Sequence, residues 1–221
     1  MQIVMISIQP QHLVKILNKE KTLEIRKKAP KSLPCKVVVY CTKSMPYLLY
    51  NKVKKKWEIS TDQELSQYSY NGAVVAEFTL NEVYTYEAEL HPDNDVYQNI
   101  QRVEYNEFIE DDEYFIETSN EENDPDDCLL LKNACLSFED VRKYVGYGAF
   151  QRFYALRIDN LIEYTNPKML SNFYKPNTKS ADDFIYEDYD GSARAGTYSD
   201  YLFRQQLRKA PQSWCYVVEG V

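Results

Sequence analysis

The stretch ISIQPQHLVKILNKEKTLEIRK, residues 6–27, predicts a strand, a short helix and a second strand in immediate succession. Pro10 suits the first turn of a helix, where its missing N–H would have no intrahelical partner anyway. Apolar residues then recur with helical spacing within 13–17. Further on, Leu23 and Ile25 alternate with polar residues, which is typical of a strand with one buried face.

The polar face of this second strand carries Thr22, Glu24 and Arg26, because side chains alternate with a period of two. Two readings of this face are open. Glu24 and Arg26 form a partly buried structural ion pair, or the row is the floor of a binding site.

The composition is that of a globular chain, with 44% hydrophobic and 14% aromatic residues among 221. This length suits one domain, 1–221, with sizeable insertions. The start MQIVMISIQPQ has no basic leader, and no segment approaches the roughly 20 apolar residues of a membrane helix. We therefore expect a cytoplasmic protein without a membrane partner. Five scattered cysteines match neither a disulfide framework nor a zinc pattern, so we expect reduced thiols, no metal and no cofactor.

Charge is divided sharply along the chain. Residues 11–57 contain 13 Lys and Arg against two Asp and Glu, whereas residues 77–127 contain one against 18. The basic block offers a surface for phosphates, although the two blocks could equally attract each other or be separately solvated. A third reading makes the acidic block a nucleic-acid mimic that binds a protein partner.

Alternation of apolar residues and turn signals predict further elements along the chain. Ser137 is a plausible N-cap for a helix at 138–145, because acidic residues follow it in the first turn. Segments 87–133, which is acidic, and 174–210 are expected to be insertions with little regular structure. The remaining predictions are strands at 3–8, 36–42, 72–86, 153–164 and 211–218, a basic hairpin at 47–60 and a helical turn at 167–173.

Several of these pieces resemble the ASCH family, a branch of the PUA-like superfamily common in bacteria and their phages. The resemblance is carried by the motif K-T-x-E-x-R at residues 21–26 and by PQSWCYV at 211–217. It covers roughly 1–43, 72–86 and 136–221, and it implies an α+β fold. This fold is a PUA-like β-barrel with short flanking helices and long inserted loops. A cleft between the first helix and the barrel, lined by the motif strand, is also implied.

Proteins that resemble this fold mostly bind RNA or modified bases, so the expected partner is nucleic acid, single-stranded RNA or a modified nucleotide. Such a cleft needs cations for phosphate, polar groups for base edges and flat rings for stacking. Trp214 is alternatively a core aromatic. Tyr40 lies in a strand that is expected to be buried, so its ring is alternatively part of the core, with only its hydroxyl reaching the cleft. The candidates in these three roles are Lys21 and Arg26, then Thr22, Glu24, Thr42 and Ser44, then Tyr40, Trp214 and Tyr216.

Two enzymatic alternatives follow from the same resemblance. One ASCH branch resembles an N4-acetylcytidine amidohydrolase; Lys21 matches its lysine, but Glu24 and Ala134 stand where its threonine and glutamate are required. This reaction is therefore not expected. A metal-independent ribonuclease would use Lys21, Glu24 and Tyr40 as acid and base groups. His12 is read as structural or solvated, and His91 lies in the acidic insertion.

Overall fold

The protein is described by a computed structural model, in which the chain divides into two compact units. Unit 1 comprises Met1–Val14, Cys35–Phe78 and Ile162–Val221, and unit 2 comprises Lys15–Pro34 and Thr79–Leu161. The described residues are 1–90, 99–103, 129–176, 185–187, 193–195 and 206–220.

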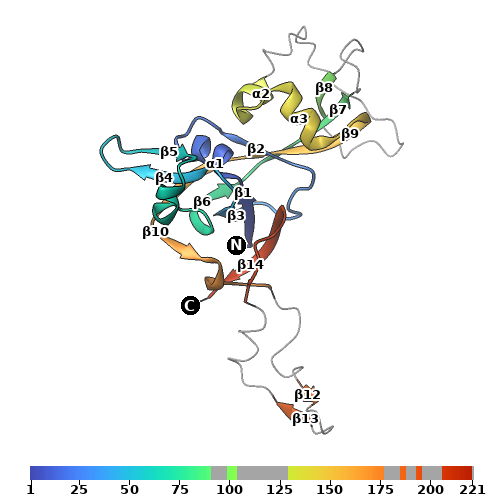
Figure 1. The fold of residues 1–221 in the computed structure, drawn as a ribbon. Coiled ribbons are helices and arrows are strands. Elements are labelled where there is room, and N and C mark those ends of the chain that lie inside the picture. Colours follow the sequence, from blue (N-terminus) through green and yellow to red (C-terminus); the bar gives the residue numbers. More distant parts are fainter. Residues whose placement is uncertain (91–98, 104–128, 177–184, 188–192, 196–205, 221) are drawn as a thin grey trace. The chain divides into compact units, whose positions relative to one another are not determined.

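The centre of unit 1 is a curled six-stranded sheet, a half-barrel with the strand order β10-β6-β3-β1-β14-β11. β1 lies between β3, to which it is parallel, and β14, to which it is antiparallel (Figure 1). The β-branched run 37–39 suits a strand that is buried on both faces. The strands are β1 (Ile3–Ile8), β3 (Cys35–Cys41), β6 (Ala73–Leu80), β10 (Asp159–Met169), β11 (Phe173–Tyr174) and β14 (Trp214–Glu219).

One core cluster of unit 1 joins this sheet to the segment after residue 206. It consists of Met5, Val38, Tyr40, Val74, Phe173, Leu207 and Val217. Smaller elements complete the unit, and one of them, α1, begins in unit 1 and ends in unit 2. They are α1 (Pro10–Leu17), β4 (Tyr47–Asn51), β5 (Lys56–Ser60), η1 (Gln63–Tyr68), η2 (Leu170–Asn172), β12 (Ile185–Glu187) and β13 (Ala193–Ala195).

A charged network links the strands of the six-stranded sheet. Lys36 Nζ lies 2.8 Å from Glu77 Oε2 and 3.7 Å from Glu219 Oε2, and the Tyr164 hydroxyl donates to Glu77 at 2.6 Å. Burial opposes ionisation of both Lys36 and Glu77, but their mutual pairing outweighs it. The pKa of Lys36 is therefore raised and the pKa of Glu77 is lowered.

Unit 2 is built on an antiparallel sheet with the strand order β2-β9-β7-β8. Its core cluster contains Leu23 and Ile25 of β2 together with Phe153 of β9 and apolar residues of both helices. Ser137 caps α3: its Oγ accepts from Asp140 N at 3.1 Å, and Asp140 Oδ2 accepts from Ser137 N at 2.9 Å. The elements are β2 (Leu23–Arg26), β7 (Val83–Leu90), β8 (Asn99–Val103), α2 (Leu129–Ala134), α3 (Phe138–Val145) and β9 (Gly148–Arg157).

The α+β class is confirmed, as are the first strand and helix, the basic hairpin and the Ser137 cap. The single strand predicted at 72–86 is wrong, because the exposed residues Asn81 and Glu82 divide it into β6 and β7, which belong to different sheets. The helical turn predicted at 167–173 is limited to the 3-10 helix η2, Leu170–Asn172. Pro167 instead lies in β10, which is an edge strand and so tolerates a residue without N–H.

The acidic insertion predicted at 87–133 contains more regular structure than expected, since β7 extends to Leu90, β8 pairs with it and α2 follows. Residues 91–98 and 104–128 of this insertion lie outside the described residues. The same holds for most of the segment predicted to be irregular at 174–210. No helix in the described part of the chain is long and apolar enough to cross a membrane.

Candidate nucleic-acid interface

A cavity of about 710 Å³ lies in unit 1, where the end of β3 meets the segment 206–212. Lys43, Arg208 and Lys209 line it, and all three are exposed. None of the described residues that line this cavity is acidic. Since three cations gather here and no described lining residue is acidic, the described part of the cavity carries positive charge in a protein with a net charge of −8.

The segment that carries Arg208 and Lys209 is fixed on both sides. Leu207 N donates to Phe173 O at 2.8 Å, which ties the segment to β11. Ser7 Oγ donates to Pro211 O at 2.7 Å, and this bond ties the other end to β1. The two cations therefore extend from a short stretch of backbone that is anchored between two strands.

Lys43 reaches the cavity from the loop that follows β3. Gly72 N donates to Cys41 O at 2.8 Å, which holds Gly72 beside the end of β3, and its φ is +86°. A Cβ at residue 72 would lie 3.1 Å from Lys43 Cε and 3.2 Å from Lys43 Cγ. Glycine at this position therefore supplies the left-handed backbone and leaves room for the aliphatic part of Lys43.

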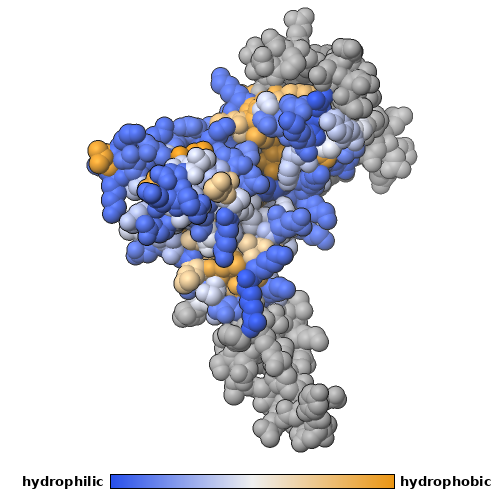
Figure 2. Space-filling view, viewed as in Figure 1, coloured by the Kyte–Doolittle hydropathy of each residue, from blue (hydrophilic) through white to orange (hydrophobic). Residues whose placement is uncertain are grey.

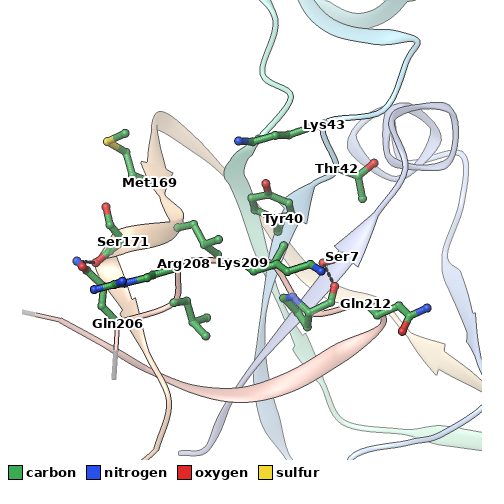
Figure 3. A pocket seen from close by; sticks show the side chains of 15 residues that line it. Ser7, Tyr40, Thr42, Lys43, Met169, Ser171, Gln206, Arg208, Lys209 and Gln212 are labelled. Carbon is green, nitrogen blue, oxygen red and sulfur yellow. Dashed lines mark hydrogen bonds between the residues drawn. The ribbon is translucent and has the colours of Figure 1, made fainter. Parts of the chain in front are cut away.

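Hydroxyl groups surround the same space. Figure 3 shows Tyr40, Lys43 and Lys209, which come from segments far apart in the sequence, around one cavity. Tyr40 is 4% exposed, and burial raises the pKa of its hydroxyl, so this group is a hydrogen-bond donor at neutral pH. Thr42 Oγ1 lies 2.7 Å from Ser44 Oγ, and Thr42 also lines the cavity.

The motif residues Lys21, Glu24 and Arg26 lie together in unit 2. Lys21 Nζ is 2.9 Å from Glu24 Oε2, and Arg26 Nη2 is 3.0 Å from Glu24 Oε1. The three residues are 3%, 4% and 9% exposed, while their neighbour Thr22 is exposed. The predicted alternation is present, but all four residues of β2 are buried, so the strand has no solvated polar face. The structure thus contains the ion pair that the sequence left open.

The remaining predicted residues take other positions. Trp214 and Tyr216 contact each other on β14 with ring centroids 5.3 Å apart at 81°, and neither lines the cavity. His12 lies on α1 and is half-buried, whereas His91 is outside the described residues. The described residues contain no group of three or more His, Cys, Asp or Glu side chains placed to hold a metal ion.

Lys43, Arg208 and Lys209 were not among the site residues predicted from the sequence. The last two stand in the segment 201–218, which contains no acidic residue, directly before the motif PQSWCYV. Their position at the cavity depends on the hydrogen bonds of residues 206–212 to β1 and β11. No local pattern in the sequence predicts these long-range contacts. The absence of neighbouring carboxylates in the sequence was the available signal.

Comparison with known proteins gives similarity in structure alone. No family model matches the sequence, and no curated protein matches it. The chain is similar to the crystal structure of ASCH from Zymomonas mobilis, with a TM-score of 0.42, 12% sequence identity, and coverage of 97% of this chain and 87% of that chain. A mutant of the same Zymomonas mobilis protein, in which one serine is replaced by alanine, gives a TM-score of 0.41 with the same identity and coverage.

Proposed function

We propose that this protein binds single-stranded nucleic acid, with RNA as the expected form, and that backbone phosphates occupy the cavity beside Lys43, Arg208 and Lys209. The observation that carries the proposal is the gathering of exposed cations in a cavity with no carboxylate among the described residues that line it. Phosphates bind such a site with release of counterions. An arginine can in addition bind a phosphate through two parallel hydrogen bonds.

The neutral groups of the cavity favour a nucleotide over a free anion. Tyr40 and Thr42 add hydroxyls to the lining, and Ser7, whose hydroxyl donates to Pro211 O, adds an acceptor oxygen. Hydroxyl groups can hydrogen-bond to phosphate, to base edges or to the 2′-hydroxyl that distinguishes RNA from DNA. The volume of about 710 Å³ is within the range of small-molecule pockets, so it suits an unpaired nucleotide.

The test measures affinity for a labelled single-stranded 12-mer RNA by fluorescence anisotropy at several salt concentrations. For single strands, log K is expected to fall with log[salt] with a slope of about −0.7 per phosphate contacted. Three cations then predict a slope near −2, and Lys43→Met or Lys209→Met is expected to reduce it by about 0.7. These substitutions keep an unbranched apolar side chain and remove the charge.

The matched control is Lys143→Met, since Lys143 is 68% exposed and lies on α3 in unit 2. It is expected to leave both affinity and salt slope unchanged. Binding that does not depend on salt, or a loss in Lys143→Met equal to that in Lys43→Met, would contradict the proposal.

The other functional hypotheses stay predictions. A ligand role for the motif strand has little support from Lys21 and Arg26, which are buried around Glu24. Trp214 and Tyr216 keep their predicted role as stacking groups. Nucleic-acid mimicry by the acidic block concerns residues that lie largely outside the described ones.

A further inference from the structure

We infer that a second recess in unit 1, at the basic hairpin of β4 and β5, binds an unpaired base of the same nucleic-acid strand by stacking. This inference rests on the proposed function and extends it to a second contact. The recess has a volume of about 380 Å³. Its aromatic lining consists of Tyr50, Tyr68 and Tyr70, alongside Lys52 and the paired residues Asn51 and Glu58.

The aromatic wall is rigid because Trp57 holds two of the tyrosines. Trp57 is 6% exposed, and its ring packs edge-on against Tyr50 at 5.2 Å and against Tyr70 at 4.9 Å. Trp57 Nε1 donates to Glu163 Oε2 at 2.7 Å, which fixes the orientation of the indole. Rings that are held before binding lose little conformational entropy when a base stacks on them.

Tyr68 provides the exposed ring of the recess. It is 67% exposed at the end of η1, whereas Tyr50 is 36% exposed. The start of η1 is fixed by Asp62 Oδ1, which accepts from Glu64 N at 3.0 Å, and by the Tyr47 hydroxyl, which donates to Gln63 at 2.7 Å. An exposed ring on an ordered element is a suitable stacking platform, since every base has a π-face.

The charge of the hairpin favours an anionic partner over a neutral or basic one, and the tyrosine lining favours a nucleic acid, whose bases can stack, over an acidic peptide without aromatic groups. The sequence from 47 to 60 contains four lysines, at 52 and 54–56, and one acidic residue, Glu58. Glu58 accepts from Lys54 at 2.8 Å and from Asn51 at 3.0 Å, so its charge is already compensated locally. Figure 2 shows a mostly hydrophilic surface over this hairpin, with one hydrophobic spot at its tip.

The recess and the cavity adjoin along the chain. Tyr70 lines the recess and Gly72 lines the cavity, and two residues span at most about 7 Å. Asn71 between them donates to Ser44 O at 2.8 Å and accepts from Leu48 N at 2.8 Å. This side chain therefore fixes the loop that leads from the cavity to β4, which places both sites within reach of one short strand.

The experiment uses the full chain and 12-mer RNAs that carry 2-aminopurine, whose fluorescence is quenched when it stacks on an aromatic ring. Tyr68→Ala and Tyr50→Ala are each expected to weaken binding about five- to tenfold, or ~1 to 1.4 kcal/mol, and to reduce the quenching. Tyr68→Phe keeps the aromatic ring and is expected to retain both the affinity and the quenching of the wild type. The salt slope is expected to remain that of the wild type in all three variants, because no phosphate contact is removed.

Tyr147→Ala is the matched control, since Tyr147 is 53% exposed in unit 2. Unchanged affinity and quenching in Tyr68→Ala and Tyr50→Ala, with weakened binding in Lys209→Met, would overturn this inference and leave the proposed function standing. No binding of any RNA or DNA would overturn both. Capture of a poly-glutamate peptide in preference to RNA, lost in Tyr68→Ala, would assign the recess to a protein partner and also overturn the inference.

Discussion

Replacing Glu24 by Gln tests whether the motif strand is scaffold. The carboxylate of Glu24 lies 2.9 Å from the Lys21 ammonium and 3.0 Å from the Arg26 guanidinium, and all three residues are less than 10% exposed. The amide removes the only negative charge from this trio and leaves two buried cations beside each other. Removal of one partner from a buried pair typically costs about 3 to 5 kcal/mol of stability.

For a chain of this length, each 1 kcal/mol shifts Tm by about 2 to 4 °C, so Glu24→Gln is expected to lower Tm by roughly 6 to 20 °C. Thermal unfolding followed by circular dichroism, together with urea unfolding followed by tryptophan fluorescence, measures this effect. The control is Glu82→Gln, because Glu82 pairs with Arg157 at 2.9 Å while both side chains are about half exposed. Its effect on Tm is expected to be much smaller.

RNA affinity measured well below the transition separates the two readings of the strand. If the trio is scaffold, the folded Glu24→Gln variant binds the 12-mer as the wild type does. A Tm within about 2 °C of the wild type, combined with a tenfold loss of affinity, would refute the scaffold reasoning and return the strand to the binding site.

Two further predictions concern stability. Ser137→Ala removes the capping box with Asp140 and is expected to cost about 1 kcal/mol in urea unfolding. Ser137→Thr, which retains the hydroxyl that accepts from Asp140 N and donates to Asp140 Oδ2, is expected to keep most of this stability, and equal losses would contradict the cap. The pKa of Glu77 is lowered from 4.5 by its pairing with Lys36, so this pairing stabilises the fold above pH 4.5 and the effect is lost as pH falls through the lower folded-state value. Glu77→Gln is therefore expected to be destabilising at pH 7 and progressively less destabilising as the pH falls below 4.5, and a loss of stability that does not shrink with falling pH would argue against this pairing.

Local patterns in the sequence predicted those elements whose formation depends on near neighbours. The spacing of apolar residues and Pro10 predicted β1 and α1, and Ser137 predicted the start of α3. The predictions were wrong where the structure of a segment depends on residues that are distant in the sequence. Pro167 is tolerated in β10 because β10 lies at an edge of the sheet. The sequence of a strand alone does not show whether the strand lies at an edge or at the centre of its sheet.

The contrast between two sets of cations shows why the candidate site was harder to predict than the fold. Lys21 and Arg26 each have Glu24 within three residues and share its single carboxylate, so part of their positive charge is compensated by a near neighbour in the sequence. Lys43 lies in the segment 25–57, which contains no Asp or Glu, and Lys209 lies in the acid-free segment 201–218. The surroundings of such cations are set by the fold, which here places both at one cavity without an acidic residue in its described lining. An anionic ligand is the counter-charge that this arrangement favours, and the salt slopes of Lys43→Met and Lys209→Met decide whether it binds there.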